Sequence, residues 1–533
     1  MKVVCDTTEA PVVKVALDLL KRDCRSVLSG EISRSENTGN IYVGTWGESS
    51  VLQALAETHQ LDVAQLNEHK EAFLLNVLPD GRLVVAGSDK RGTAYGVLEL
   101  SRMMGVSPWE WWADAVPEKK EEFRLPAGFR KLDYPQVAYR GIFINDEDWG
   151  LTPWSWKHYE PSERKGQIGP KTHARIFELL LRLRANTFWP AMHECSIPFF
   201  FTEGNKEMAD KYAICLGTSH CEPMMRNTNG EWKTAGKGEY DYVHNRKNVL
   251  SFWEERVKQL RHSDDIYTLG MRGVHDGKMQ GAKTLEEQKK ALTEILADQR
   301  RMLAKYKGKD LTKVPQVLIP YKEVLDIYQA GLQVPEDVTL MWCDDNYGYI
   351  THFPTAEEAA RPGGNGIYYH VSYWGRPHDY LWLSTASPYL LYQQMKQAYE
   401  KGIRQSIRRS YLWIWLGISV GCSRRELPGI FFIFCLGSLE LFRLLLCYPC
   451  CRSITGWHTS VNRSLWDIQE PKRKTRNTKS LLTFLGVREK SGSGCRFTRL
   501  SKTVRRYGAE ECLRQSVLLI FIWYSIPFRE LHR

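Results

Sequence analysis

The sequence predicts a protein of the α/β class, with a small N-terminal α/β domain followed by a larger domain built on parallel strands. Two observations lead to this prediction. Short apolar runs alternate with segments of helical period up to about residue 404, and from residue 138 most apolar runs end in a polar cluster. Because strand–helix alternation at this spacing is typical of parallel sheets, and eight such units close a barrel, we expect a (β/α)8-type, TIM-like barrel.

The N-terminal α/β domain is expected over residues 1–130. Its strand candidates are Val3–Cys5, residues 40–46 and residues 81–87, and the stretches PVVKVALDLLKR and TAYGVLELSRMMG have helical spacing. The stretch GSDKRGTAYG resembles a phosphate-binding loop only loosely, since it lacks the Gly-Lys-Ser/Thr ending that holds phosphate. We therefore expect a strand-to-helix turn there.

The barrel domain is expected over residues 131–404. Its seven strand candidates, each ending in polar residues, are GIFINDED (141–148), ANTFWPAMHE (185–194), YAICLGTSHCEP (212–223), IYTLGMRGVHDG (266–277), PQVLIPYKEV (315–324), VTLMWCDDNYG (338–348) and GIYYHVSYWG (366–375). Segments such as RIFELLLRLR and PYLLYQQMKQAYEKG lie between them with helical period. An eighth strand is due just after Gly402, where the rhythm stops, so the barrel is predicted to be incomplete at its eighth strand.

The last segment, residues 405–533, differs from the rest in composition. From Ser406 onward there are 22 Lys and Arg residues against 8 Asp and Glu, whereas residues 1–405 carry 51 and 54. The net charge of +11 therefore belongs to the tail, and no nucleic-acid partner is predicted for the main body. Seven of the 13 cysteines also lie in this tail, and the six others lack a disulfide-scaffold spacing.

Two interpretations of this tail compete. Residues 429–449 are apolar enough for a membrane anchor, but Glu440 and Arg443 lie inside that run, where a charge is costly. Translation out of frame, or through an intron, explains the sudden enrichment in Cys, Arg and Ser and is the interpretation we favour. The N-terminal stretch MKVVCDTTEAPVVK has no continuous apolar region typical of an export signal, so the location is left unknown.

The polar residues at the predicted strand ends should converge, because the carboxyl ends of barrel strands meet at one mouth. They are Asn145, Asp146, Glu147, Asp148, His193, Glu194, His220, Glu222, Arg272, His275, Asp276, Lys322, Glu323, Asp344, Asp345, Asn346, His370 and Tyr373. Several carboxylates beside aromatic residues suit glycoside hydrolysis, in which one carboxyl protonates the leaving oxygen and another activates water or attacks directly. Arginine, histidine and tyrosine beside them suit a negatively charged sugar such as a uronic acid.

Two other functions remain open on the residues alone. A metal-dependent hydrolase on a TIM barrel could use His193, His220, His275 and Asp276 as zinc ligands, although no HxH pair follows the first strand. A non-catalytic carbohydrate-binding protein would also use the aromatic residues, but it would not need so many carboxylates at one mouth.

The ordered motifs resemble one known family. YRGIFINDEDWG, NTFWPAMHE, GTSHCEPMMRN, GMRGVHDG, IPYKEV, WCDDNYGY and HVSYWGRPHDY are similar to the strand ends of family 115 glycoside hydrolases, the xylan α-1,2-glucuronidases. GSDKRGTAYGVLELS and MGVSPWEWWADA resemble that family's N-terminal domain and its link to the barrel. The resemblance runs from near the start to about residue 404.

The resemblance implies a function and a set of site residues. It implies release of glucuronic acid or its 4-O-methyl ether from glucuronoxylan or glucurono-xylooligosaccharides, with inversion and with no metal or other cofactor. It implies that Asp276 and Glu323 are the carboxylates on which activity most depends, with Asp146 and Asp344 also in the site. Residues matching those that hold the uronic acid are Arg272, His220, Asn145, His370 and Tyr373.

The resemblance also implies features that this sequence does not match. Family members continue with an eighth strand, a helical domain and a C-terminal β-sandwich, and they commonly dimerise through those later parts. Because the tail does not match these later parts, we do not predict a homodimer for this chain. Loss of the eighth strand and the later domains could leave the chain inactive. The family expectation for location is secreted or periplasmic.

Overall fold

The computed structural model of the chain describes residues 2–28, 33–34, 41–58, 61–144, 150–370, 387–401 and 413–418. The chain divides into two units, Met1–Phe432 and Ile433–Arg533, and every described residue lies in the first. Apart from residues 413–418, the tail and both interpretations of it lie outside the described residues. Within the described ranges, no helix combines the length and the apolar character needed to span a membrane.

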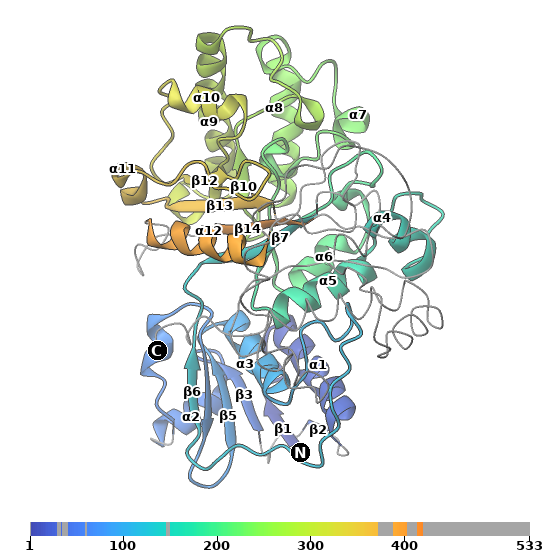
Figure 1. The fold of residues 1–533 in the computed structure, drawn as a ribbon, viewed down its shortest axis with the longest axis vertical. Coiled ribbons are helices and arrows are strands. Elements are labelled where there is room, and N and C mark those ends of the chain that lie inside the picture. Colours follow the sequence, from blue (N-terminus) through green and yellow to red (C-terminus); the bar gives the residue numbers. More distant parts are fainter. Residues whose placement is uncertain are drawn as a thin grey trace, which may run out of the picture. The chain divides into compact units, whose positions relative to one another are not determined.

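The N-terminal domain is a mixed sheet with helices against it (Figure 1). Its strands in spatial order are β2 (Ser33–Arg34), β1 (Lys2–Cys5), β3 (Ile41–Thr45), β5 (Leu83–Gly87), β4 (Phe73–Val77) and β6 (Arg130–Asp133). The first four are parallel, whereas β4 runs antiparallel to both β5 and β6. Its helices are α1 (Pro11–Val27), α2 (Ser50–Glu57), the 3-10 turn η1 (Ala64–Glu68) and α3 (Lys90–Met103). The three strands predicted for this domain are present.

The glycine-containing stretch before α3 is a strand-to-helix turn, as predicted. The Asp89 carboxylate caps the helix by accepting hydrogen bonds from the backbone N–H groups of Arg91 at 2.9 Å and Gly92 at 3.0 Å. These are the first free donors of a helix, the groups that a phosphate would otherwise occupy. The helix start is therefore satisfied from within the chain.

The second domain contains one sheet of eight parallel strands (Figure 1). They are β7 (Tyr139–Ile144), β8 (Thr187–Trp189), β9 (Cys215–Leu216), β10 (Tyr267–Leu269), β11 (Gln316–Leu318), β12 (Thr339–Cys343), β13 (Asn365–His370) and β14 (Trp413–Ile418). The spatial order β10-β11-β12-β13-β14-β7-β8-β9 follows the chain in a cycle, and the backbone N–H of Ile266, beside β10, donates to the carbonyl of Leu216 in β9 at 2.8 Å. A TIM-like domain follows the N-terminal domain, in agreement with the predicted fold class.

The eighth strand is present, which corrects the prediction of a sheet that stops at seven. β14 pairs in register with β13 from Gly366 opposite Trp413 and with β7 from Tyr139 opposite Trp413. Its residues, WIWLGI, form a short continuous apolar run, the pattern expected of a parallel strand covered on both faces. The change in composition near residue 405 obscures this six-residue pattern in the sequence.

Helices separate the strands of the second domain. They are α4 (Leu151–Trp154), α5 (Pro170–Arg182), α6 (Asn205–Lys211), α7 (Glu231–Ala235), α8 (Tyr242–Gln259), α9 (Leu285–Tyr306), α10 (Glu323–Gln329), α11 (Ala356–Ala360) and α12 (Pro388–Glu400). One-turn elements are the π-helical η2 (Ser155–Tyr159) and the 3-10 turns η3 (Phe199–Phe201), η4 (Pro223–Met225), η5 (Val274–Asp276) and η6 (Leu311–Lys313). A capping box formed by Thr284 and Glu287 starts the longest of them, α9. Phe143, Trp189, Met341 and Tyr368 belong to a buried cluster to which several strands contribute.

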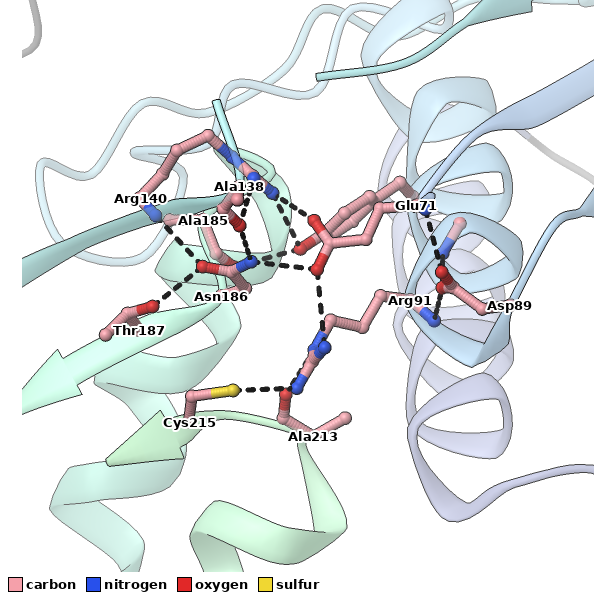
Figure 2. A network of polar contacts seen from close by, with 12 residues as sticks. Glu71, Asp89, Arg91, Ala138, Arg140, Ala185, Asn186, Thr187, Ala213 and Cys215 are labelled. Atoms are coloured by element: carbon pink, nitrogen blue, oxygen red, sulfur yellow. Dashed lines mark hydrogen bonds and ion pairs between the residues drawn. The ribbon is translucent and has the colours of Figure 1, made fainter. Parts of the chain in front are cut away.

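A buried polar network joins the N-terminal domain to the amino ends of β7 and β8 (Figure 2). Glu71 accepts from Arg140 of β7, from Arg91 of α3 at 3.3 Å, and from the Asn186 side-chain amide at 2.8 Å. Arg91 also donates to the carbonyl of Ala213 at 2.6 Å, just before β9. We call Glu71, Arg91, Arg140 and Asn186 the Glu71 network. It fixes the amino ends of these strands against the N-terminal domain.

Candidate active site

The loop after β10 is folded back on itself, which places Arg272 and Asp276 on the same side. The backbone N–H of Gly273 donates to the carbonyl of Gly277 at 2.9 Å, and that of Gly277 donates to the carbonyl of Val274 at 3.1 Å. A Cβ on Gly273 would lie 2.4 Å from the carbonyl oxygen of Lys278, so the turn requires glycine there. The two glycines of this motif therefore shape the loop that carries the charged residues.

Arg272 lies at the centre of the candidate site. Its side chain is 2% exposed, and its guanidinium donates to Glu323 through Nε at 2.9 Å and Nη2 at 2.7 Å. Its Nη1 forms an ion pair with Asp276. Such a two-bond fork onto a carboxylate fixes direction as well as charge. One buried arginine thus holds together the two carboxylates that the resemblance singled out.

Two further donors reach Asp276. His220 Nε2 lies 2.7 Å from Asp276 Oδ1, and Lys322 Nζ forms an ion pair with Asp276 Oδ2. Burial, together with the positive charges of Arg272 and Lys322, holds the pKa of His220 well below its ordinary value. The ring is therefore neutral, and since a carboxylate only accepts, Nε2 carries the proton that it donates to Asp276. We call Arg272, Asp276, Glu323, His220 and Lys322 the Arg272 cluster.

A second pair lies at the ends of β12 and β13. Asp344 Oδ1 is 2.7 Å from His370 Nδ1 and accepts from the backbone N–H of His370 at 3.0 Å, and both side chains are buried. The Tyr368 ring lies 4.7 Å from that of His370 and 6.3 Å from that of His220, between centroids. Tyr321 packs on His220 at 4.6 Å. Aromatic rings therefore connect the Asp344–His370 pair to the Arg272 cluster.

Several residues at these strand ends have left-handed backbones. Lys322, His275, Asp276 and Asn346 have φ values of 51°, 52°, 62° and 70°. Left-handed backbone is uncommon in residues other than glycine and is often found at functional sites. Lys322 directly precedes α10, and the turn there places Lys322 against Asp276 and Glu323 against Arg272.

The metal-ligand alternative fits these residues poorly. Among the described residues, the ligand atoms of His220, Cys221 and Asp276 lie within 4.8 Å of one another. Burial, followed by the charge of Glu222, raises the pKa of Cys221 to about 12, so a metal ion would have to displace the thiol proton in surroundings that favour the neutral form. Asp276 already contacts two cationic side chains, Arg272 and Lys322, whose charges would repel a metal ion. The four zinc ligands predicted from the sequence differ from this group, which lacks His193 and His275. The rings of His193 and His275 instead contact each other edge to face, with centroids 5.3 Å apart.

The structure brings together six of the nine residues to which the resemblance gives a role. Arg272, Asp276, Glu323 and His220 form one cluster, and Asp344 and His370 form the adjoining pair. Asn145, Asp146 and Tyr373 lie outside the described residues, as do Glu147 and Asp148 of the wider set of strand-end residues. Glu194 is exposed and pairs with Lys233 at 2.5 Å.

Sequence reasoning included Lys322 among the strand-end residues without giving it a specific role, and it missed two residues that the structure places in the candidate site, Tyr321 and Tyr368. Tyr321 and Lys322 directly precede Glu323, so the run Tyr-Lys-Glu after β11 was the available signal. Tyr368 lies within β13 rather than after it, and position along a strand does not reveal ring contacts.

Parallel strands whose carboxyl ends carry carboxylates, cations and aromatic rings define a TIM-like protein with a candidate binding site at that face. The model for glycosyl hydrolase family 115 matches residues 132–414, just over half of the chain. The chain belongs to glycosyl hydrolase family 115. The match extends past residue 404 into β14.

A solved structure gives the same assignment. It is described as a family GH115 4-O-methyl-alpha-glucuronidase, BtGH115A, with specificity for decorated arabinogalactans, and it is 65% identical with a TM-score of 0.74. The match covers 78% of this chain and 53% of that one, so this chain spans about half the length of that protein. No curated protein gave a significant match.

Two more distant structures match with TM-scores under 0.5 and carry no argument about function. A GH138 enzyme targeting pectin rhamnogalacturonan II is 13% identical with a TM-score of 0.48, covering 78% of this chain and 46% of that one. A beta-N-acetylhexosaminidase from Bacteroides fragilis NCTC 9343 is 12% identical with a TM-score of 0.44, covering 84% and 89%.

Proposed function

We propose that this chain is an α-glucuronidase that releases glucuronic acid or its 4-O-methyl ether from polysaccharide side chains by inverting hydrolysis. The observation that carries the proposal is the Arg272 cluster, in which one buried arginine joins two carboxylates at neighbouring strand ends. Membership of glycosyl hydrolase family 115 supports the reaction class.

In this proposal Asp276 is the general base. Arg272, Lys322 and His220 all direct donors at Asp276, and these contacts fix the position of its carboxylate. The Asp276 side chain is 31% exposed, so a water molecule can reach it. An inverting mechanism needs a carboxylate that removes a proton from the attacking water on the face opposite the leaving group.

The uronic acid carboxylate is proposed to bind on the cationic side of the cluster. Arg272 is almost fully buried and already paired, whereas the Lys322 side chain is 47% exposed. Lys322 is therefore the cation that an entering carboxylate meets first, with Arg272 behind it. Asn145, Asp146, Asp344, His370 and Tyr373 keep the site roles that the family resemblance implies.

Two polysaccharides are candidate substrates. Family resemblance implies glucuronoxylan, whereas the 65%-identical protein is described as specific for decorated arabinogalactans. Both polymers carry a uronic acid, which the cationic side of the cluster suits. We therefore propose the identity of the released sugar and leave the main chain to the test. Comparing release from the two polymers identifies the main chain.

The test is uronic acid release by the full-length chain, with the anomer of the first product followed by proton NMR. The wild type should release the β-anomer from at least one polymer. Asp276→Asn should lower turnover by about a thousandfold or more, because the base cannot then accept a proton. Asp326→Asn is the matched control, since Asp326 is exposed on α10, the helix that begins with Glu323.

Two outcomes would contradict the proposal. The first is no uronic acid release from either polymer by a folded wild-type chain. The second is an Asp276→Asn variant that works as fast as the Asp326→Asn control. Release of the α-anomer would retain the activity but overturn the inverting mechanism.

A further inference from the structure

Two tyrosines on the loop after β12 are exposed beside the candidate site. Tyr347 is 74% exposed and Tyr349 is 54% exposed, and they follow Asp344 in the run Asp-Asp-Asn-Tyr-Gly-Tyr. Large aromatic side chains normally gain stability by burying their rings. Two of them left open on one short loop next to a site suggest that the rings contact something other than this chain.

The loop is held rigid by its own hydrogen bonds. Asp345 Oδ1 accepts from the backbone N–H groups of Tyr347 at 2.8 Å and Tyr349 at 3.1 Å, and the backbone N–H of Asp345 donates to the Tyr349 carbonyl at 3.0 Å. Gly348, between the tyrosines, accepts at its carbonyl from the Tyr369 hydroxyl at 2.8 Å. Its φ of 94° suits glycine. The exposure of the two rings therefore belongs to an ordered turn.

The same loop is tied to the Arg272 cluster. Gly348 donates its backbone N–H to Asp344 Oδ2 at 3.2 Å, and Asp344 pairs with His370. The Asn346 side-chain amide donates to the Tyr321 hydroxyl at 3.5 Å, and the Tyr321 ring packs on His220. The loop therefore presents Asp344 and Asn346 to the site while Tyr347 and Tyr349 face solvent at its rim.

We propose that Tyr347 and Tyr349 form a platform on which neutral sugar rings of the polysaccharide main chain stack, on the leaving-group side of the scissile bond. This inference rests on the proposed function. The ring faces are uncharged and suit the apolar C–H face of a neutral sugar, whereas the cations that suit the uronic acid, Arg272 and Lys322, belong to the Arg272 cluster. A rigid platform loses little freedom on binding, which favours affinity.

The inference is tested first by binding, independently of turnover. Full-length wild type is titrated with undecorated β-1,4-xylohexaose and, separately, with a β-linked galacto-oligosaccharide, and binding is followed by calorimetry. One of the two oligosaccharides should bind the wild type. The Tyr347→Ala/Tyr349→Ala double variant should bind that oligosaccharide at least about tenfold more weakly. The Tyr347→Phe/Tyr349→Phe variant keeps the ring faces and should bind as the wild type does.

Kinetics on decorated substrates provide the second test. The alanine double variant should show a KM raised about tenfold on the polymer with kcat little changed, and an unchanged KM on a disaccharide of the uronic acid and one neutral sugar. Tyr389→Ala is the matched control, because Tyr389 is 72% exposed on α12 and is not on the loop.

The outcomes separate this inference from the proposed function. If neither undecorated oligosaccharide binds the wild type, or if the alanine variant binds as well as the wild type, the platform is overturned even when uronic acid is still released. If no uronic acid is released but the oligosaccharide binds through the two tyrosines, the platform stands and the catalytic proposal fails. Equal weakening by the phenylalanine and alanine variants would overturn stacking in favour of hydroxyl contacts.

Discussion

The Glu71 network and the Arg272 cluster both set arginine against carboxylate, on different strands and at opposite ends of the same parallel sheet. Arg140 belongs to the amino half of β7 and Asn186 precedes β8, whereas Arg272 and Glu323 follow β10 and β11. In the Glu71 network, Glu71 accepts hydrogen bonds from two arginines and one side-chain amide (Figure 2), and its side chain is 8% exposed. In the second, Asp276 and Lys322 are 31% and 47% exposed.

The difference shows how the same ion-pair chemistry is used for two purposes. The Glu71 network uses its donors on partners within the chain, including the Ala213 carbonyl. In the Arg272 cluster, His220 Nδ1 is buried with no hydrogen-bond partner among the described residues. Left-handed backbone occurs in both groups, at Glu71 as well as at Asp276 and Lys322, and so does not distinguish them. A network whose polar groups are all paired within the chain contributes to stability, whereas binding and catalysis require polar groups that remain exposed or unpaired.

The largest effect that we predict is a loss of stability on replacing Glu71. Replacing Glu71 with Gln leaves Arg140 and Arg91 buried without a counter-charge, and we expect the free energy of unfolding to fall by about 3 kcal/mol. Urea denaturation followed by tryptophan fluorescence measures it. Glu68→Gln is the control, because Glu68 lies three residues earlier and its side chain is exposed. It should change the free energy of unfolding by less than about 0.5 kcal/mol. An unfolding free energy equal to that of the control would mean that the network does not stabilise the fold.

The next effect sharpens the comparison through pH. Burial alone would raise the pKa of Glu71, but the charges of Arg140 and Arg91, with a hydrogen bond from Asn186, lower it below its ordinary value. A carboxyl whose folded pKa lies below its unfolded value of about 4.3 stabilises the fold above that pH and loses this contribution as the pH falls further.

The measured quantity is the difference in unfolding free energy between wild type and Glu71→Gln from pH 7 to pH 3. We expect it to be constant down to about pH 5 and to shrink as the pH falls below about 4. A difference that stays the same across that range would show that the charge of Glu71 is not the source of the stabilisation.

Much of this architecture could be predicted from the sequence because it depends on local pattern. Three of the six strands of the N-terminal domain follow from apolar runs, and seven of the eight parallel strands follow from apolar runs with polar ends. β14 was missed because a six-residue apolar run is a weak signal beside a strong shift in composition. The pairing that places Trp413 beside Tyr139 links residues far apart in sequence, and no local pattern contains it.

The sequence predicted which residues belong to the candidate site, but not which of them contact one another. Strand-end position identified Arg272, Asp276, Glu323 and His220, because parallel strands bring their carboxyl ends together. That Arg272 would bind both carboxylates, and that Lys322 would be the exposed cation, depends on the backbone turns at His275, Asp276 and Lys322. The Glu71 network was missed because its residues come from distant segments with no shared motif.

The most direct test of the central claim, that the Arg272 cluster is a uronate site and the Glu71 network is not, is the shift in unfolding temperature caused by glucuronate. Glucose at the same concentration is the neutral control, and ligand that binds only the folded chain raises the unfolding temperature. Full-length wild type, Glu71→Gln, Lys322→Gln and the Arg272→Gln/Lys322→Gln double variant are compared. We predict equal glucuronate shifts for wild type and Glu71→Gln, a smaller one for Lys322→Gln, none for the double variant, and none with glucose. A glucuronate shift that survives in the double variant, or that glucose reproduces in the wild type, would contradict the account.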